Sequence, residues 1–195
     1  MDTDPQKDYW GRFSIALHWL TFLMIVGLAA VGLTMDELPT GKLKLQVFAL
    51  HKSFGLTVLG ITALRVLWRL FERRPTLMPG PLWQRAAAVL THYGLYVMLL
   101  LVPFSGWWYN TTAGFPLKWF GLFKLPPLGE FDRALKQQAK DTHETLFWIL
   151  ATLIAVHALA ALWHHYRVRD RTLARMLPWA ERRESANANA NQEQA

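Results

Sequence analysis

Long apolar stretches separated by short polar segments dominate the pattern of this 195-residue chain. Residues 13–35 and 86–117 contain no Asp, Glu, Lys or Arg, and residues 46–64 contain only Lys52 among these types. Residues 146–163 are interrupted only by His157. A helix of about 20 residues crosses a hydrocarbon core about 30 Å thick. The pattern therefore predicts an all-α membrane bundle of four helices, at about residues 13–35, 45–70, 84–109 and 142–166.

Composition supports this assignment. Hydrophobic residues make up 52% of the chain and charged residues only 18%, which is too apolar for an ordinary soluble domain. The first apolar stretch is longer than the hydrophobic region of a secretory signal, and the segment before it is acidic rather than basic. We therefore expect the first span to be retained.

The connecting segments differ in composition. We expect a short external turn at residues 36–44, an internal link at 73–81 and a longer external loop at 115–140 that contains three prolines. Within that loop, residues 130–140 are expected to form a short surface helix along the membrane. Residues 1–178 are expected to form one transmembrane domain, and residues 179–195 a disordered tail rich in Ala, Asn and Gln.

The distribution of basic residues predicts the orientation. Most of the 21 Lys and Arg residues lie in the N-terminal segment, the link between the second and third spans, and the C-terminal segment. By the positive-inside rule, both termini are expected on the cytoplasmic side. The basic excess is thereby assigned to membrane topology, and no nucleic-acid partner is expected. The chain contains no Cys, which excludes disulfides, iron–sulfur ligation and haem attached through thioethers.

Histidines supply the candidate chemistry. His143 and His157 are 14 residues apart, which on a helix is about 21 Å along the axis and nearly the same face. In an up-down bundle, His18 falls at the depth of His157 and His51 at the depth of His143. Ionisable side chains within a bilayer are costly and usually functional. We therefore predict two layers, with His18 paired to His157 and His51 to His143.

Two imidazoles that face each other across a bundle are typical of a b-type haem with both axial positions filled, a site for electron transfer. Two haems per chain are therefore predicted. Arg65, on the face of His51 but at the inner level, is a candidate partner of haem propionates, with snorkelling to the membrane surface as the alternative. Lys52 is a candidate for the same role at the outer haem.

The remaining membrane histidines stay open. His164 lies seven residues after His157 and competes with it as a ligand of the inner haem, but that choice would place both haems at the bilayer edges. His157 is therefore preferred. His164, His165 and His92 are candidate quinone or proton-exchange residues, with interfacial anchoring or helix packing as the alternative. A His-lined metal transporter is a weaker interpretation, because the spans carry no carboxylate at mid-membrane depth.

Several motifs resemble those of the bacterial cytochrome b561 family, from about residue 9 to 178. They are SIALHW at 14–19, LHKSFG at 50–55, RVLWR at 65–69, LVPFSG at 101–106, HETL at 143–146 and VHALAALWHH at 156–165. The resemblance implies a four-helix, two-haem protein of the bacterial cytoplasmic membrane. It also matches His18, His51, His143 and His157 to the haem-ligand positions of the family.

Within the family, the chain looks most similar to short stand-alone members, among them superoxide oxidases that pass electrons from superoxide to ubiquinone. The resemblance thus implies superoxide as donor and ubiquinone as acceptor, with superoxide attracted by basic side chains of the external face, namely Lys42, Lys44, Lys118, Lys124, Arg133, Lys136 and Lys140. The family also contains cytochrome subunits that serve hydrogenases and periplasmic redox partners. An anchor that relays electrons between the quinone pool and such a partner is therefore the alternative.

Overall fold

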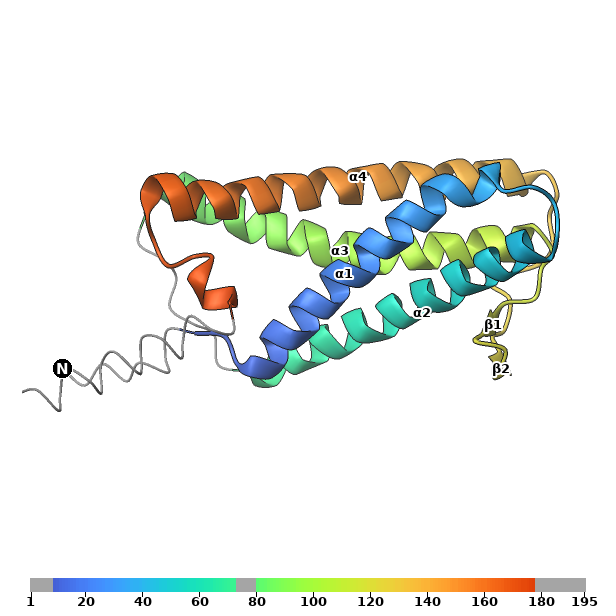
Figure 1. Cartoon of the computed structure of the whole chain (residues 1–195), viewed down its shortest axis with the longest axis horizontal. Coiled ribbons are helices and arrows are strands. Elements are labelled where there is room, and N and C mark those ends of the chain that lie inside the picture. Colours follow the sequence, from blue (N-terminus) through green and yellow to red (C-terminus); the bar gives the residue numbers. More distant parts are fainter. Residues whose placement is uncertain (1–8, 73–79, 178–195) are drawn as a thin grey trace, which may run out of the picture.

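Four long helices dominate the computed structural model, which describes residues 9–72 and 80–177. They are α1 (Arg12–Thr34), α2 (Lys42–Phe71), α3 (Leu82–Thr112) and α4 (Leu135–Trp163). Successive helices run in alternating directions, and α1 crosses the bundle obliquely (Figure 1). The predicted all-α four-helix fold is confirmed. The predicted tail at residues 179–195 lies outside the described residues.

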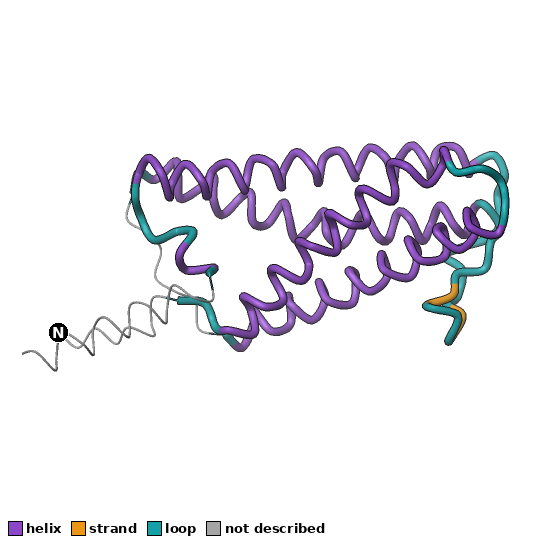
Figure 2. The backbone as a smooth tube through the Cα atoms, in the orientation of Figure 1, coloured by secondary structure: helices purple, strands orange, loops and turns teal. Residues whose placement is uncertain are grey.

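Each helix packs mainly against its neighbour in the chain, so that α1 contacts α2, α2 contacts α3, and α3 contacts α4. The described connections lie at the two ends of the elongated bundle (Figure 2). We call the end that holds the start of α1 and the end of α4 the inner end, and the opposite end the outer end. Depth in the bundle is therefore set by position along each helix.

The interior combines a small apolar cluster with buried hydroxyls. Val58, Leu99 and Leu150 form the cluster, one each from α2, α3 and α4. Thr21 and Thr62 are also fully buried, and the Thr21 hydroxyl donates to the Leu17 carbonyl one turn back. A small hydroxyl that is satisfied by its own helix lets neighbouring helices approach closely, as membrane bundles do.

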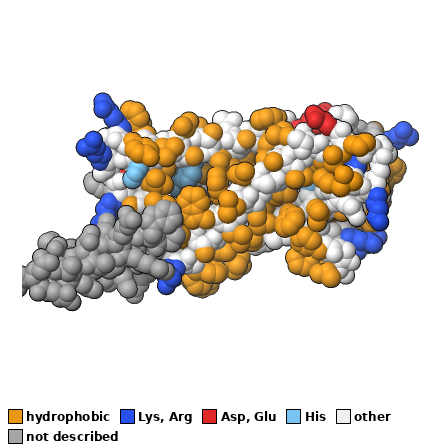
Figure 3. Space-filling model, viewed as in Figure 1, with side chains coloured by type: hydrophobic (Ala, Val, Ile, Leu, Met, Phe, Trp, Pro, Cys, Tyr) orange, Lys and Arg blue, Asp and Glu red, His pale blue; other side chains and the backbone are white. Residues whose placement is uncertain are grey.

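The exterior is apolar between two charged ends. Leu23 of α1, Leu90 of α3 and Leu159 of α4 are 64%, 75% and 65% exposed. In Figure 3, hydrophobic side chains cover the long sides of the visible face, and Lys and Arg gather at the ends. All four helices are long and apolar enough to span a membrane. An exposed apolar surface of this extent requires lipid rather than water.

At the inner end, Glu72, the first residue after α2, caps the N-terminus of α1. The Glu72 carboxylate accepts hydrogen bonds from the Gly11 backbone N–H at 3.1 Å and from the Ser14 hydroxyl at 2.6 Å. A carboxylate at a helix N-terminus satisfies free N–H groups and complements the helix dipole. The segment after α4, which includes the 3-10 helix η4 (Ala174–Met176), returns across this end, where the Trp19 indole donates to the Met176 carbonyl at 2.7 Å.

The outer loop differs from the expectation. No separate surface helix forms at residues 130–140, because residues up to Ala134 are not helical and Leu135 already begins α4. The loop instead contains a small hairpin of β1 (Lys118–Trp119) and β2 (Phe123–Lys124), paired antiparallel. The hairpin is attached to α2, since the buried Ser53 hydroxyl accepts the Phe120 N–H at 3.0 Å.

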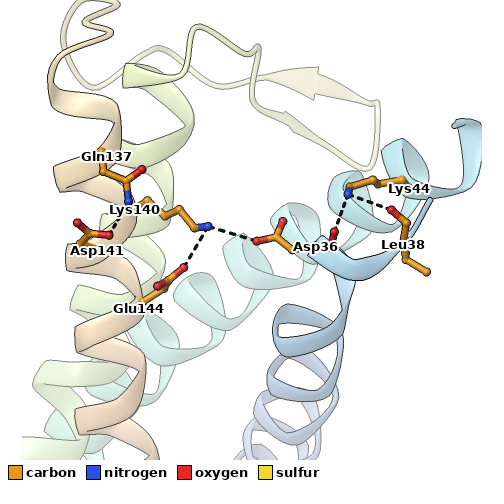
Figure 4. Close-up of polar contacts among 7 residues, drawn as sticks. All are labelled: Asp36, Leu38, Lys44, Gln137, Lys140, Asp141 and Glu144. Atoms are coloured by element: carbon orange, nitrogen blue, oxygen red, sulfur yellow. Dashed lines mark hydrogen bonds and ion pairs between the residues drawn. The ribbon is translucent and has the colours of Figure 1, made fainter. Parts of the chain in front are cut away.

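A charged network closes the outer end between α4 and the turn after α1, which contains the 3-10 helix η2 (Met35–Glu37). The Lys140 amine lies 3.4 Å from the Asp36 carboxylate and 3.5 Å from that of Glu144 (Figure 4). The Lys44 amine donates to the carbonyls of Asp36 and Leu38, at 2.7 and 3.0 Å. Lys140 therefore links α4 to the turn after α1 at this end.

Candidate functional site

The inner histidine layer forms between α1 and α4. The ring centroids of His18 and His157 lie 6.2 Å apart, with an angle of 65° between the ring planes. The sequence predicted this pairing from helix depth alone, and the structure brings the two rings together. Both side chains are at least partly shielded from solvent.

His92 of α3, for which the sequence left a proton-exchange role and helix packing open, also lies in this layer. Its ring centroid lies 5.1 Å from that of His157. Its Nδ1 atom is 2.5 Å from the Ala88 carbonyl. A carbonyl only accepts hydrogen bonds, so in this arrangement Nδ1 carries the proton.

Arg65 of α2 reaches the same layer. Its Nη2 atom lies 3.4 Å from His18 Nδ1, and its guanidinium lies over the Tyr96 ring at 5.6 Å. The position agrees with the expectation that Arg65 lies at the inner level. It leaves a permanent cation beside the His18–His157 pair, and such a cation suits an anionic group bound there.

The outer layer contains His51 of α2 and His143 of α4. His143 Nδ1 lies 2.9 Å from the Ser105 hydroxyl and 3.1 Å from the Val102 carbonyl, both on α3. His51 Nδ1 is buried and has no hydrogen-bond partner among the described residues. The two outer imidazoles therefore differ in hydrogen bonding at Nδ1.

Two glycines face the outer rings. A Cβ atom on Gly32 of α1 would lie 3.1 Å from His51 Cε1, and one on Gly106 of α3 would lie 3.0 Å from His143 Cε1. Both distances are shorter than ordinary van der Waals contact. A side chain at either position would therefore crowd the facing ring and require it to move by a few tenths of an ångström.

An apolar groove of about 320 Å³ opens between α1 and α2 beside His51. Its lining is aliphatic and aromatic apart from that histidine: Met24, Gly27, Leu28, Val31, Val47, Leu50, His51 and Phe54. Concave, mostly apolar spaces with a single polar group are typical of sites for flat hydrophobic ligands.

Lys52 lies on the outer side of this layer. Its amine donates to Asn110 Oδ1 at 3.1 Å and lies 5.9 Å from the centre of the Phe115 ring. Asn110 is itself fixed, because its amide donates to the Phe115 carbonyl at 2.6 Å. Both partners of the Lys52 cation are neutral, so its charge is not compensated by them.

His164 does not extend the helical stripe, because α4 ends one residue before it and the π-helix η3 (His164–Val168) follows. Its Nδ1 atom lies 2.5 Å from Asp170 Oδ2, and Asp170 Oδ1 accepts the Thr172 N–H at 2.8 Å. Burial alone would raise the pKa of Asp170, but the hydrogen bonds from Thr172 and His164 outweigh it and lower that pKa. His165 lies against the Tyr166 ring and is not part of either layer.

The basic residues of the outer face divide into two groups. Lys140 is engaged with two carboxylates, and Lys44 with two carbonyls. The others have exposed side chains: Lys42, Lys118, Lys124, Arg133 and Lys136. The positive field of this face therefore rests mainly on the second group.

Five contributors to the site were not predicted as such: Gly32, Ser105, Gly106, Asn110 and Asp170. Ser105 and Gly106 stand in the quoted segment LVPFSG, yet nothing local to that segment indicates a contact with a histidine 38 residues away. The signal that would find them is helix periodicity, since Val102, Ser105 and Gly106 share one face of α3.

The sequence profile described as prokaryotic cytochrome b561 matches residues 9–179. Two Escherichia coli proteins, cytochrome b561 homolog 2 and homolog 1, are each 34% identical over 172 residues, which covers 86% of this chain and 90% and 97% of theirs. The probable superoxide oxidase CybB of Yersinia pestis is 28% identical over 165 residues, 84% of this chain and 93% of that protein. With its four membrane spans, the chain therefore belongs to the prokaryotic cytochrome b561 family of membrane electron-transfer proteins, and this membership implies b-type haem.

Proposed function

We propose that His18 and His157 are the axial ligands of an inner haem b, and His51 and His143 those of an outer one. The observation that carries this proposal is the 6.2 Å separation of the His18 and His157 ring centroids. The two imidazoles come from different helices and lie in one layer, so together they would hold the iron of a b-type haem, which would supply a one-electron carrier there.

The outer layer also fits a haem. Gly32 and Gly106 leave no side chain at positions where a Cβ would press on His51 and His143. His51 is a buried imidazole without a partner at Nδ1 among the described residues, which is costly unless the ring serves a ligand. The apolar groove beside it offers a surface of the kind a porphyrin edge packs against.

Two cations are placed to receive carboxylates. Arg65 lies beside His18, and Lys52 follows His51 and has only neutral hydrogen-bond and ring contacts within residues 9–72 and 80–177. We assign Arg65 to propionates of the inner haem and Lys52 to those of the outer haem. His164 is engaged with Asp170 beyond the end of α4, so it is not assigned as an iron ligand.

We further propose that the protein oxidises superoxide at its outer face and reduces ubiquinone. When bound, a b-type haem supplies a one-electron carrier at each layer. Two superoxide anions each lose one electron and become dioxygen, while ubiquinone gains two electrons and two protons and becomes ubiquinol. The exposed basic residues of the outer face and Lys52 would attract the anion. The resemblance to a probable superoxide oxidase supports this assignment.

An anchor that relays electrons between the quinone pool and a periplasmic redox partner or hydrogenase is the second candidate. It is favoured by the higher identity to the two cytochrome b561 homologues than to the probable superoxide oxidase. The two-haem arrangement serves either role. What differs is whether the outer face reacts with a small anion or with a protein.

The orientation follows from the same distribution of charges. Arg12, Arg69, Arg167, Arg169 and Arg171 lie at the inner end, which we therefore place in the cytoplasm with both termini. The hairpin and the Lys140 network would then face the periplasm.

The first experiment is a dithionite-reduced minus air-oxidised spectrum of the detergent-purified protein, with haem quantified per chain. We expect two b-type haems, one of which is lost in His18→Ala and the other in His143→Ala. His165→Ala is the matched control, since His165 belongs to neither layer. A protein without haem, or one whose haem content is insensitive to both substitutions, would refute the ligand assignment.

The donor is tested next on the wild-type protein. Rapid reduction by a pulse of superoxide, followed by ubiquinol formation, supports the superoxide oxidase. Slow reduction by superoxide, together with fast reduction by a co-purifying soluble protein, supports the anchor instead.

A further inference from the structure

The turn of α3 that contains Ser105 makes hydrogen-bond contacts with the ring of His143. Ser105 is only 7% exposed, and its hydroxyl donates to the Val102 carbonyl at 2.7 Å. His143 Nδ1 approaches both groups, at 2.9 Å from Ser105 Oγ and 3.1 Å from the Val102 oxygen. Three polar groups from two helices therefore meet at one point within the apolar bundle.

The chemistry of these groups fixes the tautomer of His143. A carbonyl oxygen can only accept, so the proton between it and His143 belongs to Nδ1. The Ser105 proton is directed to the same carbonyl, which leaves the Ser105 oxygen as a second acceptor for Nδ1–H. Nε2 then keeps its lone pair, the form in which an imidazole binds iron.

Gly106 makes this approach feasible. A Cβ at position 106 would lie 3.0 Å from His143 Cε1 and 3.3 Å from His143 Nδ1. A side chain there would push the ring away from Ser105 and Val102. The hydrogen bonds therefore depend on the serine and the glycine together, on adjacent positions of α3.

The contrast with the other outer histidine is informative. His51 Nδ1 is buried with no partner among the described residues, whereas His143 Nδ1 has two acceptors. An acceptor at Nδ1–H increases the electron density that an imidazole gives to its metal and stabilises the oxidised iron. The two imidazoles of this layer are therefore unequal donors.

We propose that Ser105 is a positioning residue that holds the ring of His143 as a second acceptor of its Nδ1–H, beside the Val102 carbonyl, and lowers the reduction potential of the outer haem. The proposal rests on the assignment of His143 as a ligand of that haem. It adds a role for a hydroxyl that contacts the histidine rather than the cofactor. A lower outer potential would favour onward transfer of each electron to the inner haem.

The test is a redox titration of the haem-loaded protein followed by absorbance, with low-temperature EPR of the oxidised form. Ser105→Ala removes one of the two acceptors of His143 Nδ1 and leaves the Val102 carbonyl, and Ser105→Thr keeps a hydroxyl at the same place. Thr112→Ala is the matched control, because Thr112 is also buried on α3 and donates three residues back, to the Tyr109 carbonyl. His143→Ala identifies which of the two potentials belongs to the outer haem.

We expect Ser105→Ala to retain two haems and to raise the outer potential alone, by up to about tenfold in the reduction equilibrium, or about 59 mV for one electron. Its EPR signal should shift as well, while Ser105→Thr and Thr112→Ala keep the wild-type values. Loss of the outer haem in Ser105→Ala with retention in Ser105→Thr would also support the proposal.

Two results would overturn it separately. If Ser105→Ala keeps both haems with unchanged potentials and EPR signals, or if Ser105→Thr behaves like Ser105→Ala, the role of Ser105 is wrong and the ligand assignment stands. If His143→Ala retains two haems, the ligand assignment itself has failed.

Discussion

His164 Nδ1 and Asp170 Oδ2 lie 2.5 Å apart, across the turn that follows α4. The Asp170 backbone N–H also donates to the His164 carbonyl at 3.2 Å, so side chains and backbone close the same loop. This pair holds the start of the segment that returns over the inner end of α1, where the Met176 carbonyl accepts the Trp19 indole N–H.

We predict that Asp170→Asn lowers the stability of the inner end. Hydrogen bonds to a charged group contribute about 1–2 kcal/mol, which corresponds to a decrease of about 2–8 °C in Tm for a chain of this size. The pKa of Asp170 is lowered in the folded protein, so its carboxylate contributes stability above about pH 4, and this contribution is lost as the pH falls through the folded pKa.

The measurement is thermal unfolding of the detergent-purified protein at pH 7, 5 and 3.5. The deficit of Asp170→Asn should be smaller at pH 3.5 than at pH 7, because the Asp170 carboxylate of the wild type is then being protonated. Asp132→Asn is a suitable control, since Asp132 is also a carboxylate that accepts backbone N–H groups, but at the outer end. An equal deficit at all three pH values would contradict the role of the charge.

Gly106→Ala is predicted to destabilise the outer layer, although alanine is the better helix former by about 1 kcal/mol. The new methyl would lie 3.0 Å from His143 Cε1, and crowding of this kind typically costs about 1–3 kcal/mol. The control is Gly60→Ala on α2, where a Cβ meets nothing within 4 Å among the described residues.

Haem content per chain and the Tm of both variants provide the measurement. Gly106→Ala should lose part of the outer haem and have a lower Tm than the wild type. Gly60→Ala should keep the wild-type haem content, with a Tm equal to or above that of the wild type. Identical behaviour of the two variants would show that the ring of His143 is free to move away.

Lys52→Met is predicted to lower the potential of the outer haem. Loss of a nearby positive charge favours the oxidised, more positive iron, by roughly twofold to tenfold in the reduction equilibrium. Lys52→Arg should restore most of the wild-type value. Lys124→Met, on the exposed hairpin, is the control for a charge removed from the same face. A potential that is the same in Lys52→Met and wild type would remove Lys52 from the outer haem site.

The four spans and the two histidine layers could be predicted because they depend on local composition and helix periodicity. Apolar stretches are an intrinsic property of the chain, and 14 residues between His143 and His157 fix their relative depth. The first residue of α4 was harder to predict from the sequence. Hydropathy marks only the part of a helix that lies in lipid, whereas α4 begins at Leu135 and includes polar residues before its apolar part.

The missed features depend on contacts between distant residues. Each strand of the hairpin has only two residues, too few for an alternation pattern, and its position depends on Ser53 and Thr57 of α2. The hydrogen bond between Ser105 and His143 joins residues on two different helices. Such contacts follow from the rotation of one helix against another, which a single sequence does not specify.

If superoxide is the donor, the two members of the Lys140–Asp36 ion pair should affect its reaction in opposite directions. The pair lies at the outer end with exposed side chains, so its contribution to stability is below about 1 kcal/mol. Asp36→Asn removes the negative partner and should speed haem reduction at low salt by about 1.5-fold to 3-fold, while Lys140→Gln should slow it by a similar factor.

Stopped-flow reduction by superoxide at low and high ionic strength makes the comparison, because salt should bring the wild type and both variants to one slower rate. Arg85→Gln removes a positive charge near the start of α3, at the inner end, and should leave the rate unchanged. Rates that do not depend on salt, or that move in the same direction in Asp36→Asn and Lys140→Gln, would mean that charge does not guide the donor to this face. A protein partner that docks through the hairpin would then be the better explanation, because Leu122 and Phe123 project from it with 74% and 55% exposure.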